Sequence, residues 1–391
     1  MIKSSKKSLF LFSFLMTVNF CTPVFAAFFQ SEHGFSKSQI TSLFAIFSFA
    51  VFIFEIPTGL IGDKIGEKKS LIIGAILTGL ATILFIIGNK PLIYIGEVVF
   101  GLGSTFYSGP FESLVYKYCK CSEDNLDYDR IVSKTYSLQW GALCFSFVGC
   151  FFLTKYGNIR FPFIATLVSN LLLCITAFCL PAASKGNKEN THTFSIMKGF
   201  LYDIYSNKLL RTVCGLNIFF SMILVSGYQL LQTYLLESAV PKSYNGLLYF
   251  IAAIFASFGS FFFDKLQSII KSKKAILLFS LLVISICFLG LAIVTDVFLI
   301  FVLVSCYRLV WGVASPMFAS MVNKSIMKDD YRNTTFSMVS LGNNLSSSIL
   351  LFIFVMLNLH VKYYYIILGV LTVVAIIIYT CSKKLQSISK S

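Results

Sequence analysis

Residues 55–88 read EIPTGLIGDKIGEKKSLIIGAILTGLATILFIIG, a glycine-rich segment with several charges followed by an apolar run. The run from Ser70 to Gly88 carries no charge and approaches the roughly 20 apolar residues that a helix needs to cross a bilayer. Eleven further apolar runs lie near 8–29, 38–60, 91–114, 134–154, 161–181, 213–235, 244–263, 275–295, 297–321, 335–357 and 362–381. The sequence therefore predicts an all-α membrane protein with twelve transmembrane helices.

The composition of the 391-residue chain excludes an ordinary soluble protein. Hydrophobic residues make up 57% and charged residues 13%, against about 45–50% and 25% in soluble domains. The net charge is +15, but the basic residues lie in short segments between apolar runs. Most of these segments would lie on the same face of the membrane as the amino terminus. This asymmetry predicts that both termini are cytoplasmic and argues against nucleic-acid binding. The 11 cysteines are dispersed, so neither a disulfide framework nor a metal site is expected.

The amino terminus has two interpretations. Lys6 and Lys7, the apolar run and the small residues Ala26 and Ala27 resemble a cleavable secretory signal. Cleavage would leave eleven spans, and the run is long for a signal. We therefore expect an uncleaved first helix.

Shared landmarks predict a duplication. Residues 1–182 form an expected N-terminal six-helix bundle, 183–212 a cytoplasmic linker with an interfacial helix, and 213–391 a C-terminal six-helix bundle. Three pairs of segments recur in the same order: Asp63-Lys64 with Asp264-Lys265, Glu97–Gly101 with Arg308–Gly312, and Arg130 with Arg332. Six spans per copy give the two repeats the same orientation. Parallel repeats of this kind place a substrate site between them near the bilayer midplane.

The charged loop carries a resemblance to a known family. It resembles the G-x-x-x-D-[RK]-x-G-x-[RK] signature of the major facilitator superfamily, with matches at Gly59, Asp63, Lys64, Gly66 and Lys68. Glu67 stands where a basic residue is common. Three segments, of which the first overlaps the loop, resemble patterns of the bacterial drug:proton antiporter branch. They are Glu55–Gly59, Ser108–Tyr116 and Arg332–Ser337.

The resemblance implies the major facilitator fold, with two bundles around a central cavity, in a bacterial inner membrane. It also implies that Asp63 latches a cytoplasmic gate. The alternative is a solvated loop whose charges only set the topology.

Two ionisable residues lie inside predicted spans, where charge is costly and usually functional. Glu97 occupies the position at which the family usually carries arginine, and Arg308 occupies the equivalent position of the second repeat. We hypothesise that they pair in one access state and couple a proton to transport. A structural ion pair is the alternative. Glu55 and Glu112 are further proton-carrier candidates, although structural hydrogen bonding is the simpler role for each.

A candidate substrate cavity is outlined by polar and aromatic residues inside spans. These are Asn19, Tyr107, Gln139, Trp140, Tyr228, Gln229, Trp311, Asn343 and Asn344. Arg308 and Trp311 share a helix face because they are three residues apart. We expect about half of the set to line the cavity and the others to join helices by hydrogen bonds.

Motif searches exclude several enzyme classes. The chain has no G-x-x-x-x-G-K-[ST] loop, HExxH or GxSxG motif, which argues against an ATP-driven pump or a hydrolase. The sequence favours a monomeric secondary transporter without a cofactor, which exports a small amphiphilic or toxic compound as protons enter. Its partners would be that small molecule, protons and the lipid bilayer. Two alternatives stay open: a transporter of an anionic metabolite or siderophore anchored by Arg308, and a membrane sensor that does not transport.

Overall fold

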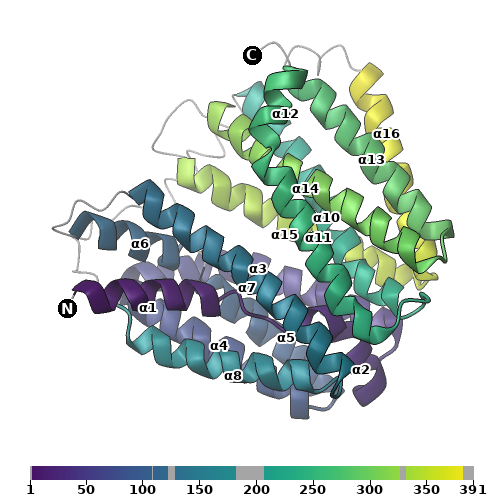
Figure 1. Cartoon of the computed structure of the whole chain (residues 1–391). Helices are drawn as coiled ribbons and strands as arrows, with labels where there is room; N and C mark the ends of the chain where they lie inside the picture. The colour runs from purple at the N-terminus through teal and green to yellow at the C-terminus, as the bar shows by residue number, and fades with distance from the viewer. Residues whose placement is uncertain (1, 108, 122–127, 182–206, 326–331, 382–391) are drawn as a thin grey trace. The chain divides into compact units, whose positions relative to one another are not determined.

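A computed structural model of the chain, shown in Figure 1, describes residues 2–107, 109–121, 128–181, 207–325 and 332–381. These residues form helices and no strands. Ten of the described helices are long and apolar enough to cross a membrane. The predicted all-α membrane class is confirmed.

Contacts divide the chain into two compact units. The first holds Met1–Glu189 and Pro241–Phe250, and the second holds Asn190–Val240 and Ile251–Ser391. The predicted bundles 1–182 and 213–391 stay a prediction. Most of the predicted linker lies outside the described residues.

The first unit contains most of the helices at the purple and blue end of the chain in Figure 1. They are α1 (Ile2–Leu15), η1 (Thr22–Val24), α2 (Phe25–His33), α3 (Lys37–Ile65), α4 (Glu67–Ile87), α5 (Lys90–Thr105), α6 (Pro110–Cys121), α7 (Tyr128–Lys155), α8 (Phe161–Phe178) and η2 (Lys242–Tyr244). Helix α4 packs on α5 and α8, α3 packs on α5, and α1 packs on α7 and α8. Apolar residues from α1, α4, α6 and α8 form one of its buried cores.

The second unit contains the remaining helices. They are α10 (Lys208–Leu235), α11 (Asn245–Phe261), α12 (Phe263–Ile270), α13 (Lys273–Ile293), α14 (Val297–Ser325), α15 (Arg332–Leu357) and α16 (Val361–Cys381). The first residues of α11, up to Phe250, are grouped with the first unit. Helix α10 packs on α15 and α14, and α13 packs on α16 and α14.

The first predicted span, 8–29, is interrupted. Residues 16–21, which we call the first-span break, separate α1 from η1 and α2. The missing helical bonds are replaced from distant helices: the Thr166 hydroxyl accepts the Phe20 and Cys21 amides at 3.0 and 3.2 Å. The Ser146 hydroxyl accepts the Asn19 amide at 3.0 Å. Because a buried amide needs a partner, the hydroxyls of Ser146 and Thr166 stabilise the non-helical backbone of the break.

The fourth predicted span, 91–114, is also interrupted. Helix α5 ends at Thr105 and α6 begins at Pro110. Gly109 adopts φ +74°, a conformation that glycine takes without the penalty a Cβ imposes. Proline is favoured as the first residue of a helix. The Gly109-Pro110 pair therefore accounts for the restart of the helix.

Candidate functional site

The described guanidinium of Arg308 lies beside two aromatic rings of the second unit. Its guanidinium carbon lies 4.7 Å from the Tyr228 ring centroid and 4.5 Å from that of Trp311. The two rings are 5.9 Å apart and nearly perpendicular. We call these three residues the aromatic clamp. A guanidinium over aromatic faces gains a cation–π attraction that strengthens when water is excluded.

Two helices build the clamp. Arg308 and Trp311 come from α14 and Tyr228 comes from α10, which pack on each other. Helix α14 is held closely against α11 at Gly312, where any Cβ would overlap the carbonyl oxygen of Ala256. The Ser260 hydroxyl also donates to the Gly312 carbonyl at 2.8 Å. The rotation of α14, and with it the direction of Arg308, is therefore set by this crossing.

The clamp leaves hydrogen-bonding capacity unused. The Arg308 Nε is buried without a hydrogen-bond partner in the described part of the chain. The buried hydroxyls of Ser226 and Tyr307 also lack one there. Tyr307 adjoins Arg308 in sequence, and its ring packs on that of Phe288 at a centroid distance of 5.4 Å. An unpaired buried donor is costly, so the Arg308 Nε suits a ligand that supplies an acceptor oxygen.

Glu97 occupies a different setting in the first unit. Its side chain, on α5, belongs to a residue that is only 3% exposed. No described side chain gives it a hydrogen bond or an ion pair. The predicted pair of Glu97 with Arg308 would join the two units and stays a prediction.

Residues of the gating motif lie around the turn between α3 and α4. Gly66 adopts φ +89° and receives the end of α3, with its amide donating to the Gly62 carbonyl at 2.8 Å. Lys68 donates to the Leu180 carbonyl at 2.8 Å. Gly59 and Lys64 are exposed. The side chain of Asp63 lies outside the described atoms, so its latch role stays a prediction.

Glu67, the departure from the family signature, has a local explanation. It accepts a hydrogen bond from Ser113 at 2.8 Å and forms an ion pair with Lys117. Both partners come from α6, so a carboxylate here joins α4 to the helix that follows the fourth-span break. As an acidic residue in the first turn of α4, Glu67 also complements the helix dipole.

The other acidic candidates lie in separate places. Glu112 is exposed and accepts a hydrogen bond from the Tyr136 hydroxyl at 3.2 Å. Glu55 is half-buried on α3. Structural hydrogen bonding is thus an adequate role for Glu112, and proton carriage by either residue stays a prediction.

The predicted cavity residues divide into three groups. Tyr228 and Trp311 join the clamp. Asn19 caps the first-span break, with Oδ1 accepting from the Thr22 amide at 3.1 Å and the Cys21 thiol at 3.0 Å. The other six residues are dispersed. Tyr107 is hydrogen-bonded to Thr78, Gln139 lies 3.4 Å from Ser13, and Asn344 donates to Ser340 of its own helix. Trp140 is exposed, Gln229 lies on α10, and the Asn343 Oδ1 is buried without a described partner.

Sequence reasoning missed the residues that hold the break. Ser146 and Thr166 follow no motif, since hydroxyl residues are common in membrane helices and usually bond to their own backbone. Both also do so here, to Ala142 and Pro162. Pro23, in the second half of the first apolar run, was the local indication that this helix would not be continuous.

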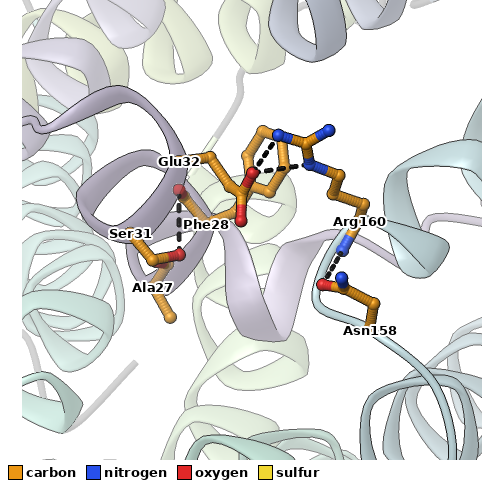
Figure 2. A network of polar contacts seen from close by, with 6 residues as sticks. All are labelled: Ala27, Phe28, Ser31, Glu32, Asn158 and Arg160. Carbon is orange, nitrogen blue, oxygen red and sulfur yellow. Dashed lines mark hydrogen bonds and ion pairs between the residues drawn. The ribbon is translucent and has the colours of Figure 1, made fainter.

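An ion pair ties the end of α2 to the loop before α8 in the first unit. Figure 2 shows Glu32 accepting from the Arg160 guanidinium, with the Nε–Oε2 distance at 2.5 Å. The Arg160 amide contacts Asn158 at 3.4 Å, and Ser31 bonds within α2 to the Ala27 carbonyl at 2.8 Å. This pair anchors the far end of the interrupted first span.

Comparisons with known proteins agree with this architecture. The model of the Major Facilitator Superfamily matches residues 8–351. The chain is 24% identical over 369 residues to the uncharacterized MFS-type transporter YxaM of Bacillus subtilis (strain 168), covering 89% of this chain and 88% of that protein. A second relative, the uncharacterized MFS-type transporter MJ1560 of Methanocaldococcus jannaschii, is 23% identical over 269 residues, or 66% of this chain and 67% of that one.

Solved structures share the fold at low sequence identity. The nucleoside transporter NupG superposes with a TM-score of 0.78 at 12% identity, covering 98% of this chain and 99% of that one. A D-xylose-proton symporter gives a TM-score of 0.70 at 15% identity, covering 96% and 95%. The fold and the family model together identify a multi-pass membrane transporter rather than an enzyme, and the chain belongs to the Major Facilitator Superfamily.

Proposed function

We propose that this secondary transporter carries a small amphiphilic organic anion, anchored by Arg308. The observation that supports the proposal is the aromatic clamp, with a guanidinium that has a buried Nε lacking any described hydrogen-bond partner. A planar guanidinium matches the geometry of a carboxylate or phosphate and can bind it through two parallel hydrogen bonds. The rings of Tyr228 and Trp311 offer apolar surface to the rest of the molecule.

The charge of the clamp distinguishes the candidate substrates. Within the described residues, no carboxylate forms an ion pair with Arg308. A cationic amphiphile at this place would meet a like charge in a medium of low dielectric, where repulsion is strong. The clamp thus supports the alternative that the sequence left open, an anionic metabolite or siderophore, over a cationic drug. Export of an amphiphilic compound stays compatible with it when that compound is an anion.

The direction of transport and the coupling to protons are carried forward from the sequence. Export driven by proton entry remains our working prediction, and a sensor without turnover remains its rival. Substrate-dependent ion flux separates the two, because a sensor gives none.

The chain offers an intrinsic reporter for the substrate test. It has two tryptophans, Trp140 and Trp311, so Trp140→Phe leaves the clamp residue as the single tryptophan. Purified Trp140→Phe protein is titrated with aromatic and aliphatic carboxylates and with cationic amphiphiles, while Trp311 emission is followed. We expect a saturable change with at least one carboxylate and none with the cations.

Variants of Arg308 then test the anchor. Arg308→Gln in the Trp140→Phe background should weaken carboxylate binding by about 10- to 100-fold, the value of a hydrogen bond to a charged group. Arg308→Lys should recover only part, because lysine lacks the planar fork. Arg160→Gln is the matched control and should bind normally. Saturable binding of the cations, or carboxylate binding that survives Arg308→Gln, would overturn the proposal.

Transport is measured with the same compounds. Proteoliposomes loaded with the best-binding carboxylate should show counterflow in the wild type and about tenfold less in Arg308→Gln. Binding without counterflow would favour the sensor.

A further inference from the structure

A pocket lies at one end of the helices of the second unit. It is lined by the end of α10 and the loop after it, by the turn between α13 and α14, and by the beginning of α16. Its volume is about 330 Å³, within the usual range of small-molecule sites. The lining includes Tyr234, Glu237, Val294 and Lys362. The pocket therefore combines an aromatic ring with one acidic and one basic side chain.

The acidic and basic side chains of the pocket are not paired with each other. Glu237 forms an ion pair with His360, whose Nε2 lies 2.7 Å from Oε2 of the carboxylate. A carboxylate has two oxygens and about four acceptor positions, so this pair does not by itself fill them. In the described part of the chain, no carboxylate forms an ion pair with Lys362. The pocket thus offers a hydrogen-bond acceptor and a cation to one ligand.

The aromatic side of the pocket is held by ring packing. The Tyr234 ring lies 5.4 Å from that of Tyr365 and nearly perpendicular to it, and Tyr365 packs on Phe288 at 5.5 Å. The Tyr365 hydroxyl donates to the Gly227 carbonyl at 2.9 Å, and the Tyr234 hydroxyl donates to the Val294 carbonyl at 3.3 Å. Because Tyr234 is held at its ring and at its hydroxyl, it offers a preorganised apolar surface.

The turn that precedes Lys362 is fixed as well. The Tyr364 hydroxyl donates to the Phe354 carbonyl and accepts from the Leu359 amide, both at 2.7 Å. The rings of Phe354 and Tyr364 stack at 4.5 Å. His360, in the same turn, supplies the ion pair to the loop after α10. These contacts set the backbone position of Lys362 before any ligand binds.

We propose that this pocket binds a small zwitterion of the amino-acid type. The ligand's ammonium would bind Glu237, its carboxylate would bind Lys362, and its apolar part would pack on Tyr234. Hydrogen bonds between charged groups are about twice as strong as neutral ones. A simple anion would meet the like charge of Glu237, whose side chain is only 8% exposed, and repulsion is strong where water is excluded. A simple cation would meet the like charge of Lys362. A zwitterion meets neither.

The zwitterion site goes beyond the proposed function and does not rest on it. The proposed substrate anion is anchored by Arg308, which is not among the residues that line this pocket. With both termini cytoplasmic, as the sequence predicts, this end of the second unit faces outward. A ligand would then reach the pocket directly from the outer solution.

The primary experiment is a calorimetric titration of the purified protein in detergent with L-leucine, β-alanine and γ-aminobutyrate. These zwitterions carry the same two charges at increasing separation. The N-acetyl derivative of the best ligand lacks the ammonium, and its methyl ester lacks the carboxylate. We expect saturable binding of at least one zwitterion. Each derivative should bind about tenfold more weakly or worse, because it loses a hydrogen bond between charged groups.

Variants assign each charge to its residue. Glu237→Gln should weaken zwitterion binding by about 10- to 100-fold but bind the N-acetyl derivative at least as well as the wild type does. Lys362→Gln should weaken zwitterion binding by a similar factor but bind the methyl ester at least as well. Glu32→Gln, which alters a carboxylate paired with Arg160, and Lys242→Gln, which alters an exposed lysine, are the matched controls and should bind normally.

The selectivity of these variants separates binding from folding. A misfolded protein would lose the zwitterion and both derivatives alike. Lys362 forms no ion pair in the described part of the chain, so Lys362→Gln should fold even if the loss of the Glu237 carboxylate disturbs the His360 turn. The proposal can therefore be tested with this variant alone.

Three outcomes would overturn the zwitterion site. The first is the absence of saturable binding for all three zwitterions. The second is a derivative that binds as tightly as its parent zwitterion. The third is zwitterion binding that depends on Arg308 and not on Lys362, which would assign the ligand to the aromatic clamp. Loss of carboxylate binding at Arg308, with zwitterion binding intact, would overturn the proposed function alone.

Discussion

The two units differ in the continuity of two of their helices. In the first unit, the first and fourth predicted spans are each interrupted, at residues 16–21 and between Thr105 and Pro110. In the second unit, the helices that the predicted repeat aligns with these spans, α10 and α14, are continuous over 28 and 29 residues. The first unit has a buried carboxylate, Glu97, on α5, whereas the second has a guanidinium, Arg308, beside two aromatic rings on α14 and α10. If the predicted duplication is correct, the two copies differ in the chemistry of their first and fourth helices.

A shared crossing underlies this divergence. Gly101 follows Glu97 by one helical turn and contacts Ala50 of α3, where a Cβ would lie 2.8 Å from the alanine methyl. Gly312 follows Arg308 by the same spacing and contacts Ala256 of α11. Each glycine allows its helix to approach the neighbouring helix closely. The ionisable residue one turn earlier lies on the same face of the helix as the glycine. The two positions thus share the glycine contact and differ in the sign of the charge one turn before it.

The largest effect is expected at the Gly312 crossing. Gly312→Ala would press a methyl group into the Ala256 carbonyl, and overpacking against backbone costs about 3 kcal/mol or more. The apparent melting temperature should fall by roughly 5 °C or more. Gly101→Ala should cost less, because it meets mainly a side-chain methyl. Gly141, with no atom within 4 Å of its Cβ position, is the control. Equal melting temperatures for all three variants would refute the shared crossing.

The opposite charges of the two units can be tested as a pair. If Glu97 and Arg308 meet in one access state, Glu97→Gln and Arg308→Gln should each lower transport by about tenfold. The double variant should then lose less than the product of the two effects. Counterflow in proteoliposomes measures all three. Strict additivity would mean that the two charges act independently.

The next effect concerns the support of the first-span break. Thr166→Val removes the acceptor of the Phe20 and Cys21 amides, and an unsatisfied buried donor costs about 1–3 kcal/mol. Thr154→Val is the control. The Thr154 hydroxyl contacts only Cys150 of its own helix in the described part of the chain, so we expect the free energy of unfolding to change by no more than about 0.5 kcal/mol. Thermal unfolding compares them. Similar stability of both variants would show that the break does not depend on Thr166.

The smallest effect is expected at the departure from the family signature. Glu67→Lys places two ammonium groups together at Lys117 and should cost about 1 kcal/mol, as is typical of a partly exposed pair. Lys117→Glu in the same chain should recover part of the loss, but not all, because the helix dipole of α4 still favours an acid at position 67. The recovery should shrink at high salt. A double variant as unstable as Glu67→Lys alone would assign Glu67 another role.

Local patterns predicted one part of the candidate site and missed the rest. The spacing of Arg308 and Trp311 placed both on one helix face, and the structure brings both together with Tyr228. No local sequence pattern indicated that Tyr228, from α10, would join these two residues while the other predicted cavity residues would not. A helix face can be read from a period of 3.6 residues, but the neighbour of that face depends on packing.

The sequence by itself determined the membrane class, the approximate position of the spans and the family, because hydropathy and the loop signature are local properties of the chain. Only the tertiary structure decided that two apolar runs are interrupted and which polar groups are left without partners. An apolar run of sufficient length is most stable as a continuous helix unless distant groups replace its hydrogen bonds. In the first span those groups lie 127 and 145 residues away in sequence, and no local pattern specifies them.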